Sequence, residues 1–227
     1  MALLKGEGTH QILYGGADIF SGLRHNRGYL ARPDHAGSFP AVLLVHGRGG
    51  LTSSVKSFAR RLARHGLAVV APDLFRGTPR RPEPPWPALP HIVSDVLGTY
   101  QWMASPDTPW VDVRRIGVLA FDRGAGVATR FTADTQTVEG LVLVSPVFDE
   151  DAPSTTVPTL GFYGKDDAVA GPELRRTTQA QLDQAEWILY GGAGHALTDE
   201  AAPDYRWEVA EDVVTRAVGF LARTIAT

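Results

Sequence analysis

Short, continuously apolar runs that end in turn-forming residues are the feature that most constrains how this chain can fold. Residues 41–45 read Ala-Val-Leu-Leu-Val and stop at a glycine-rich turn, and residues 67–71 form a second such run. Between them, apolar side chains recur at helical spacing, with Ser53 or Ser54 as the expected N-cap and Gly66 beyond the last turn. Runs of this length are typical of strands buried on both faces. The segment therefore predicts a strand–helix–strand unit with a right-handed crossover.

The same alternation continues along the chain. Antiparallel edge strands are expected at about residues 10–14 and 28–31, further strands over 116–121, 141–144, 159–163 and 187–190, and helices over 92–103, 124–132 and about 209–221. Alternating strands and helices predict an α/β fold, a doubly wound and mostly parallel sheet with helices on both faces. Residues 1–227 are expected to form one domain of this kind.

Composition excludes several classes of function. The 227 residues are 44 % hydrophobic and 21 % charged, as in an ordinary globular protein, and no apolar stretch approaches the ~20 residues of a membrane span. A net charge of −3 predicts no nucleic-acid partner, and without cysteine there is no thiolate chemistry. The histidines lack metal-ligand spacing, so neither metal nor other cofactor is expected. We expect a cytoplasmic protein, monomer or homodimer, that acts on a small molecule.

A proline-rich segment covers residues 75–90, with six prolines that exclude a regular helix or a central strand there. One interpretation is a lid over the site, in which Trp86 lines the pocket. Arg76, with Arg80 and Arg81, would then steer an anionic substrate. The alternatives are a solvated loop for the arginines and a purely anchoring role for Trp86.

Three loops that follow predicted strands carry the residues suited to catalysis. Asp122 lies between small residues at a strand-to-helix turn, Asp166 and Asp167 follow the next-but-one strand, and His195 ends a glycine-rich loop after the last strand. In such sheets, catalytic groups lie at the carboxyl ends of the strands. The order nucleophile, acid, histidine is that of α/β-hydrolases.

The chain resembles the dienelactone hydrolase family over almost its whole length. Residues 40–77 are similar to the first half of that family, residues 28–33 to its early strand and residues 193–195 to its histidine loop. The resemblance implies that His195 is the catalytic histidine and Asp167 its acid, with Asp166 as the alternative. The chain departs from the family in two places: its elbow cysteine is replaced by Asp122, and Gly47 replaces an acidic residue after the first strand.

Residues 122–124 read Asp-Arg-Gly. This elbow resembles that of haloacid-type and haloalkane dehalogenases and of epoxide hydrolases, several of which carry the same three residues. The implied chemistry is displacement at a saturated carbon by Asp122, followed by hydrolysis of the resulting ester by water that His195 activates. Backbone N–H groups of Arg123 and of the turn at Gly47 and Arg48 would hold an oxyanion. The Arg123 side chain would pair with a substrate carboxylate.

Several functions stay open at this level. The whole-chain resemblance favours a hydrolase of a small, carboxylate-bearing ester or lactone, whereas the elbow favours a carbon–halogen bond or an epoxide. His195 could also activate water directly while Asp122 only positions it. The alternatives outside hydrolysis are a lyase-type or cyclase-type enzyme and a non-catalytic binding protein that keeps the pocket. His46 is expected to be structural.

Overall fold

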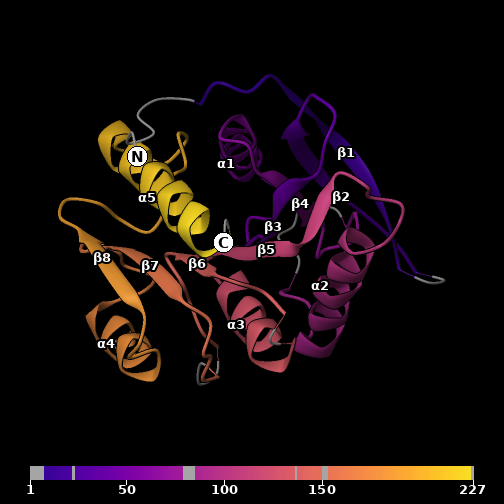
Figure 1. The fold of residues 1–227 in the computed structure, drawn as a ribbon. Helices are drawn as coiled ribbons and strands as arrows, with labels where there is room; N and C mark the ends of the chain where they lie inside the picture. Colours follow the sequence, from indigo (N-terminus) through magenta and orange to yellow (C-terminus); the bar gives the residue numbers. More distant parts are fainter. Residues whose placement is uncertain (1–7, 22–23, 79–84, 136, 150–152, 226–227) are drawn as a thin grey trace.

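The computed structural model describes residues 8–21, 24–78, 85–135, 137–149 and 153–225, and one sheet runs through these parts of the chain (Figure 1). Its eight strands are ordered β1-β2-β4-β3-β5-β6-β7-β8. The strands are β1 (Ile12–Ser21), β2 (Arg24–Pro33), β3 (Phe39–Val45), β4 (Ala68–Pro72), β5 (Val111–Phe121), β6 (Leu141–Val144), β7 (Thr159–Gly164) and β8 (Glu186–Tyr190). The helices are α1 (Ser53–Arg64), α2 (Leu89–Met103), α3 (Gly124–Thr135), α4 (Pro172–Gln181) and α5 (Trp207–Thr224).

Strands β3 to β8 are parallel, whereas β1 and β2 join them as an antiparallel pair at one edge. This confirms the predicted doubly wound, mostly parallel sheet. The edge strands are ten residues each, longer than expected, and pair from Ile12 opposite Pro33 to Ser21 opposite Arg24. The strands were predicted too short because only one face of β1 packs against the rest of the protein. Its exposed residues and its glycines interrupt the apolar run that marks a buried strand.

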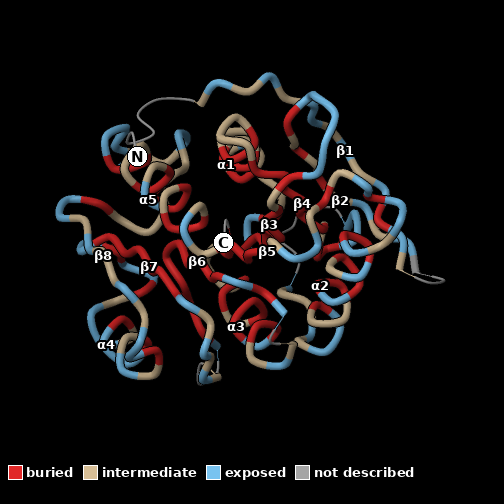
Figure 2. Tube along the Cα trace, viewed as in Figure 1, coloured by how far each residue is buried: buried red, intermediate tan, exposed pale blue. Residues whose placement is uncertain are grey.

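Helices cover both faces of the sheet. Helices α1 and α5 lie on one face and α2, α3 and α4 on the other, as Figure 1 shows. Along β3, Val42 and Leu44 pack with the first group of helices, while Leu43 and Val45 pack with the second. A strand buried on both sides needs no polar alternation, which explains the unbroken apolar run. Figure 2 shows the buried central strands between more exposed helices.

Helix α1 begins one residue earlier than expected. Its N-cap is Thr52, whose side chain accepts a hydrogen bond of 3.2 Å from the N–H of Val55, so the prediction of Ser53 or Ser54 was wrong. Ser54 instead donates to the carbonyl of Thr198, which ties α1 to the loop after β8. Gly66 follows the helix as predicted, with a φ of +93° that favours glycine.

The proline-rich segment ends in a helix. Helix α2 starts at Leu89 and has Pro90 in its first turn, where a missing N–H costs nothing, so the expectation of no helix up to residue 90 was wrong at its end. Residues 79–84, with Arg80 and Arg81, lie outside the described residues. Helix α4 was not expected, because it buries only Arg175 and Thr178 and has no apolar stripe. No helix in the described ranges is long and apolar enough to cross a membrane.

The inner face of α1 offers a test of the core. Leu62 is fully buried, whereas Leu97 on α2 is 37 % exposed. Leu62→Ala is expected to lower the free energy of unfolding by about 2–5 kcal/mol, because it leaves a cavity between helix and sheet. Leu97→Ala removes the same atoms and should cost less than about 1 kcal/mol. Urea unfolding of both variants measures the difference; equal losses would contradict this packing.

Candidate active site

Asp122 occupies the sharp turn between β5 and α3. Its φ is +48°, a conformation rare for a residue with a side chain and typical of strained functional turns. The turn lies close against the end of β3: a Cβ added at Gly124 would be 2.5 Å from the carbonyl oxygen of His46. Glycine at this position is therefore required by the contact between the two strand ends. The geometry is that of a nucleophile elbow, which raises one side chain above the sheet.

The two carboxylate oxygens of Asp122 have different partners. Oδ2 accepts a hydrogen bond of 2.9 Å from the backbone N–H of Arg48. Oδ1 lies 3.4 Å from Nε2 of His195. A Cβ at residue 47 would be 2.5 Å from the Cβ of Asp122, so the glycine there makes room for the aspartate. Glycine in place of an acidic residue at position 47 thus removes a negative charge and also leaves space for the side chain of Asp122.

Asp167 holds the other side of the imidazole. Its Oδ2 lies 2.8 Å from Nδ1 of His195, and its Oδ1 accepts hydrogen bonds of 2.8 and 2.7 Å from the N–H groups of Val169 and Ala170. The side chain is inaccessible to solvent and its rotamer is fixed by these bonds. Asp166, the alternative acid, has an exposed side chain. The structure thus brings Asp122, His195 and Asp167 together.

The charges of these three groups depend on one another. Burial opposes a charge on His195, but hydrogen bonds to Asp122 and to Asp167 outweigh it and raise the pKa of His195 to about 9. Burial also opposes ionisation of both carboxyl groups, and the imidazole and backbone N–H groups outweigh it, so the pKa of Asp122 and that of Asp167 are lowered. All three shifts therefore favour the charged forms, an imidazolium between two carboxylates.

The expected oxyanion donors lie around Asp122 itself. Gly47 lines the same hollow as Asp122, while the N–H of Arg48 is bonded to the Asp122 carboxylate. Burial raises the pKa of Asp122, and the contact with His195 and the backbone N–H groups of Arg48 and Arg123 outweigh it. The guanidinium of Arg123 forms an ion pair of 3.0 Å with Asp149. A substrate carboxylate would have to compete with Asp149 for it.

Two other candidate substrate contacts lie on the segment before α2. Arg76 forms two hydrogen bonds, of 2.9 and 2.7 Å, with the buried carboxylate of Asp95, so this guanidinium holds the segment to α2. Trp86 packs edge-on against Phe75 and His46, with ring centroids 5.6 and 6.4 Å apart, and also lines a pocket beside α3. The ring contacts show the anchoring role, and the pocket that Trp86 lines is separate from the hollow of Asp122 and His195.

His46 is completely buried at the end of β3. Its Nε2 accepts a hydrogen bond of 3.0 Å from the N–H of Leu74, so Nδ1 carries the proton and donates to the carbonyl of Gly47. The ring joins the turn after β3 to the segment after β4. These contacts agree with the structural role expected from the sequence.

Ser145 was missed by the sequence reasoning. It has a φ of +47°, is buried at the end of β6, and donates a hydrogen bond of 2.6 Å to the backbone carbonyl of His195. The hydroxyl therefore ties the end of β6 to the histidine loop. No local pattern marks this serine, because its partner lies fifty residues later in the chain.

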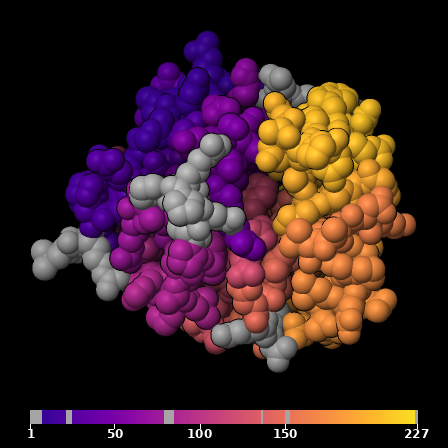
Figure 3. Space-filling view, turned by 180° about the vertical axis from the view of Figure 1, so that it is seen from behind, coloured from indigo at the N-terminus to yellow at the C-terminus, as the bar shows by residue number. Residues whose placement is uncertain are grey.

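The site opens into a hollow of about 160 Å³ formed by both halves of the chain. Asp122 and His195 line it together with the first turn of α1 and residues 196–199. Figure 3 shows the surface hollowed where the first half of the chain meets the C-terminal half. Within the described ranges, no three His, Asp or Glu side chains are grouped as metal ligands would be.

Known proteins are similar to this chain over most of its length. The sequence model of the dienelactone hydrolase family matches residues 26–225. Proteins named "Putative carboxymethylenebutenolidase" are similar: that of Yersinia pestis is 26 % identical over 90 % of this chain and 86 % of its own, and that of Escherichia coli K12 is 28 % identical over 81 % and 77 %. The structure named "Putative Dienelactone Hydrolase" from Klebsiella pneumoniae superposes with a TM-score of 0.82, at 23 % identity, over 94 % of this chain and 99 % of the other.

The family match covers both the elbow and the histidine loop, and the superposition shows the α/β-hydrolase fold over nearly the whole chain. The resemblance drawn from the sequence motifs is confirmed, and so is the expectation of a hydrolase. This chain belongs to the dienelactone hydrolase family.

Proposed function

We propose that this dienelactone-hydrolase-like enzyme hydrolyses a small molecule by displacement at a saturated carbon, with Asp122 as the nucleophile. The observation that carries the proposal is the position of the Asp122 carboxylate, held at the elbow by the N–H of Arg48 on one side and facing His195 on the other. A carboxylate is a weak nucleophile toward an acyl group but is competent to displace a halide or open an epoxide.

The contact with Arg48 favours displacement over direct attack on an ester. In acyl transfer, backbone N–H groups stabilise the oxyanion that forms on the substrate. Here the N–H of Arg48 is already bonded to Oδ2 of Asp122, so an ester oxygen would have to replace it. The same bond anchors Oδ2 and leaves Oδ1 as the attacking atom. The N–H of Arg48 then stabilises the second step, in which the ester carbonyl oxygen of Asp122 becomes an oxyanion.

The proposed reaction has two steps. In the first, Oδ1 of Asp122 forms a bond to the substrate carbon, and the carbon–halogen or carbon–oxygen bond breaks, with the electron pair leaving on the halide or the epoxide oxygen. In the second, water attacks the carbonyl carbon of the new ester while His195 takes its proton. The alcohol leaves and the carboxylate of Asp122 is restored. For an epoxide, the alkoxide formed in the first step takes up a proton, and the net change is the addition of one water. For a halide, hydroxyl replaces the halogen, and halide and one proton are released.

The charges of the site fit this order of steps. With both carboxylates ionised, the pKa of His195 is about 9, and the ring is an imidazolium that cannot accept a proton. Once Asp122 is an ester, one of the two carboxylates has lost its charge, and the pKa of His195 falls toward its ordinary value. The histidine therefore becomes a base after the first step, when the mechanism needs one.

The competing route, in which His195 activates water on the free enzyme, places the opposite demand on the histidine. It needs a neutral ring, whereas the hydrogen bonds to Asp122 and Asp167 outweigh burial and raise the pKa of His195 to about 9. Ester and lactone substrates would be hydrolysed most simply by this route. The two routes differ in measurable ways.

Replacement of the nucleophile is the first test. On a panel of aryl esters, lactones, haloacetates and epoxides, Asp122→Asn should lose on the order of a thousandfold or more in kcat, because the amide cannot form the ester intermediate. Asp166→Asn is the matched control, since it makes the same change on an exposed neighbour of the site. If Asp122→Asn keeps its activity, Asp122 is not the nucleophile. If the wild type hydrolyses nothing, the non-hydrolytic and binding alternatives gain support.

The pH dependence of kcat/KM separates the two routes. Displacement needs only an ionised Asp122, whose pKa is lowered, so kcat/KM should stay flat between about pH 6 and 8. Direct activation of water needs neutral His195, and kcat/KM would rise about tenfold per pH unit toward pH 9. In Asp122→Asn, the loss of one carboxylate lowers the pKa of His195. A direct route would then survive with its profile moved to lower pH.

Isotope labelling shows whether water attacks the ester carbonyl of Asp122 or the substrate itself. In a single turnover in ¹⁸O-water, the product oxygen should come unlabelled from Asp122, and the label should appear in the peptide that contains Asp122. Mass spectrometry of the product and of the digested enzyme measures both. Label in the product together with an unlabelled peptide would exclude the covalent route.

A further inference from the structure

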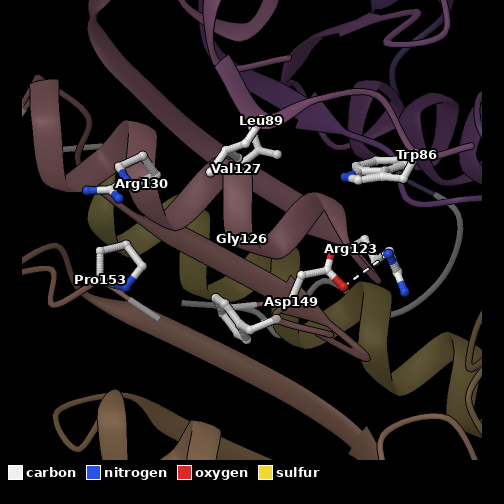
Figure 4. A pocket seen from close by; sticks show the side chains of 9 residues that line it. Trp86, Leu89, Arg123, Gly126, Val127, Arg130, Asp149 and Pro153 are labelled. Carbon is white, nitrogen blue, oxygen red and sulfur yellow. Dashed lines mark hydrogen bonds and ion pairs between the residues drawn. The ribbon is translucent and has the colours of Figure 1, made fainter. Parts of the chain in front are cut away.

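A second pocket adjoins the elbow on the side of α2 and α3. Trp86 lines it from the segment before α2, Leu89 from the start of α2 and Val127 from the first turns of α3 (Figure 4). Phe148 lines it from the segment after β6. Its volume is about 180 Å³. A cavity of roughly 150 Å³ lined by apolar side chains is enough to hold benzene. The pocket therefore has room for a group the size of a phenyl ring.

The pocket lies beside the elbow, although Asp122 and His195 themselves line the other hollow. Arg123, the residue after Asp122, lines it, and α3 forms one wall. The segment that carries Phe148 is bonded to the elbow, since the N–H of Val147 donates to the carbonyl of Asp122 over 3.1 Å. A ligand in this pocket would therefore lie against the helix and the segment that position the Asp122 side chain.

The lining selects an apolar group, and an aromatic one best. Val127 and Phe148 are at most 9 % exposed, and the rings of Trp86 and Phe148 provide two aromatic surfaces, which favour another ring through edge-to-face or offset contacts. At the rim, Arg123 is paired with Asp149, and Arg130 forms no ion pair with any described residue. Among the described residues that line the pocket, the two arginines outnumber the one carboxylate.

We propose that this pocket binds an aromatic ring of the substrate, so that the enzyme prefers aryl-substituted epoxides or halides whose reacting carbon lies at Asp122. The proposal rests on the proposed function for the reaction itself, but the binding of the ring does not depend on turnover. The ring enters an apolar pocket and its water is released, which contributes binding energy that a methyl group cannot supply.

Gly126 allows the pocket to be filled. A Cβ at this position would lie 3.8 Å from Cδ1 of Phe148, an ordinary van der Waals distance, so a leucine side chain there enters the pocket without a backbone clash. The matched control is Asp134→Leu, which adds the same side chain to an exposed position of α3. Thermal unfolding of both variants checks their folding. Trp86→Leu, which removes one aromatic wall, is a second variant that does not depend on filling the pocket.

The first measurement is selectivity. The ratio of kcat/KM for styrene oxide to that for propylene oxide should fall at least about tenfold in Gly126→Leu and also fall in Trp86→Leu, whereas Asp134→Leu should keep the wild-type ratio. An unchanged ratio in both pocket variants would overturn the proposal.

The second measurement is binding without turnover. In the Asp122→Asn background, calorimetric titration with 1-phenyl-1,2-ethanediol should show binding that Gly126→Leu weakens at least about tenfold. Such binding, together with a wild-type enzyme that hydrolyses none of the substrates, would support this inference and count against the proposed function. If the wild type hydrolyses aryl substrates but Gly126→Leu leaves the binding unchanged, the proposed function is supported and this inference is contradicted.

Discussion

The close approach of two strand ends holds this site together. The turn after β5 lies directly against the end of β3, and a methyl group at Gly124 or at Gly47 would collide with its neighbours at about 2.5 Å. Because β3 and β5 are adjacent and parallel, both turns emerge at the same edge of the sheet. This contact brings the N–H of Arg48 to the carboxylate of Asp122. The strained φ of Asp122 is maintained by the same packing.

From this contact follows the electrostatic character of the site. Asp122 is held on one side of the imidazole and Asp167 on the other, and the two carboxylates together raise the pKa of His195. A cysteine or serine at the elbow would leave the imidazole with one carboxylate. The aspartate thus changes the electrostatics of the site as well as the side chain at the elbow, because its carboxylate helps to raise the pKa of His195. This difference separates the chain from what its family motifs alone imply.

Much of the fold could be predicted, since strands buried on both faces leave an unbroken apolar signal such as that of β3. The signal failed where burial is one-sided or sparse. Strand β1 alternates with exposed residues and was predicted too short, and α4 has no apolar stripe and was not found. The N-cap was predicted at Ser53 or Ser54, one or two residues after Thr52, because three hydroxyl residues follow one another and only the helix geometry selects among them.

The sequence by itself determined the α/β architecture, the family, and the order of Asp122, the acid and His195, because these depend on local patterns read along the chain. Only the tertiary structure decided which acid contacts the imidazole, and that Arg76 and Arg123 are engaged by Asp95 and Asp149. Partners that lie 19 to 28 residues apart are matched by the packing of loops and helices. Such contacts depend on side-chain directions in the folded protein, which no spacing of residue types encodes.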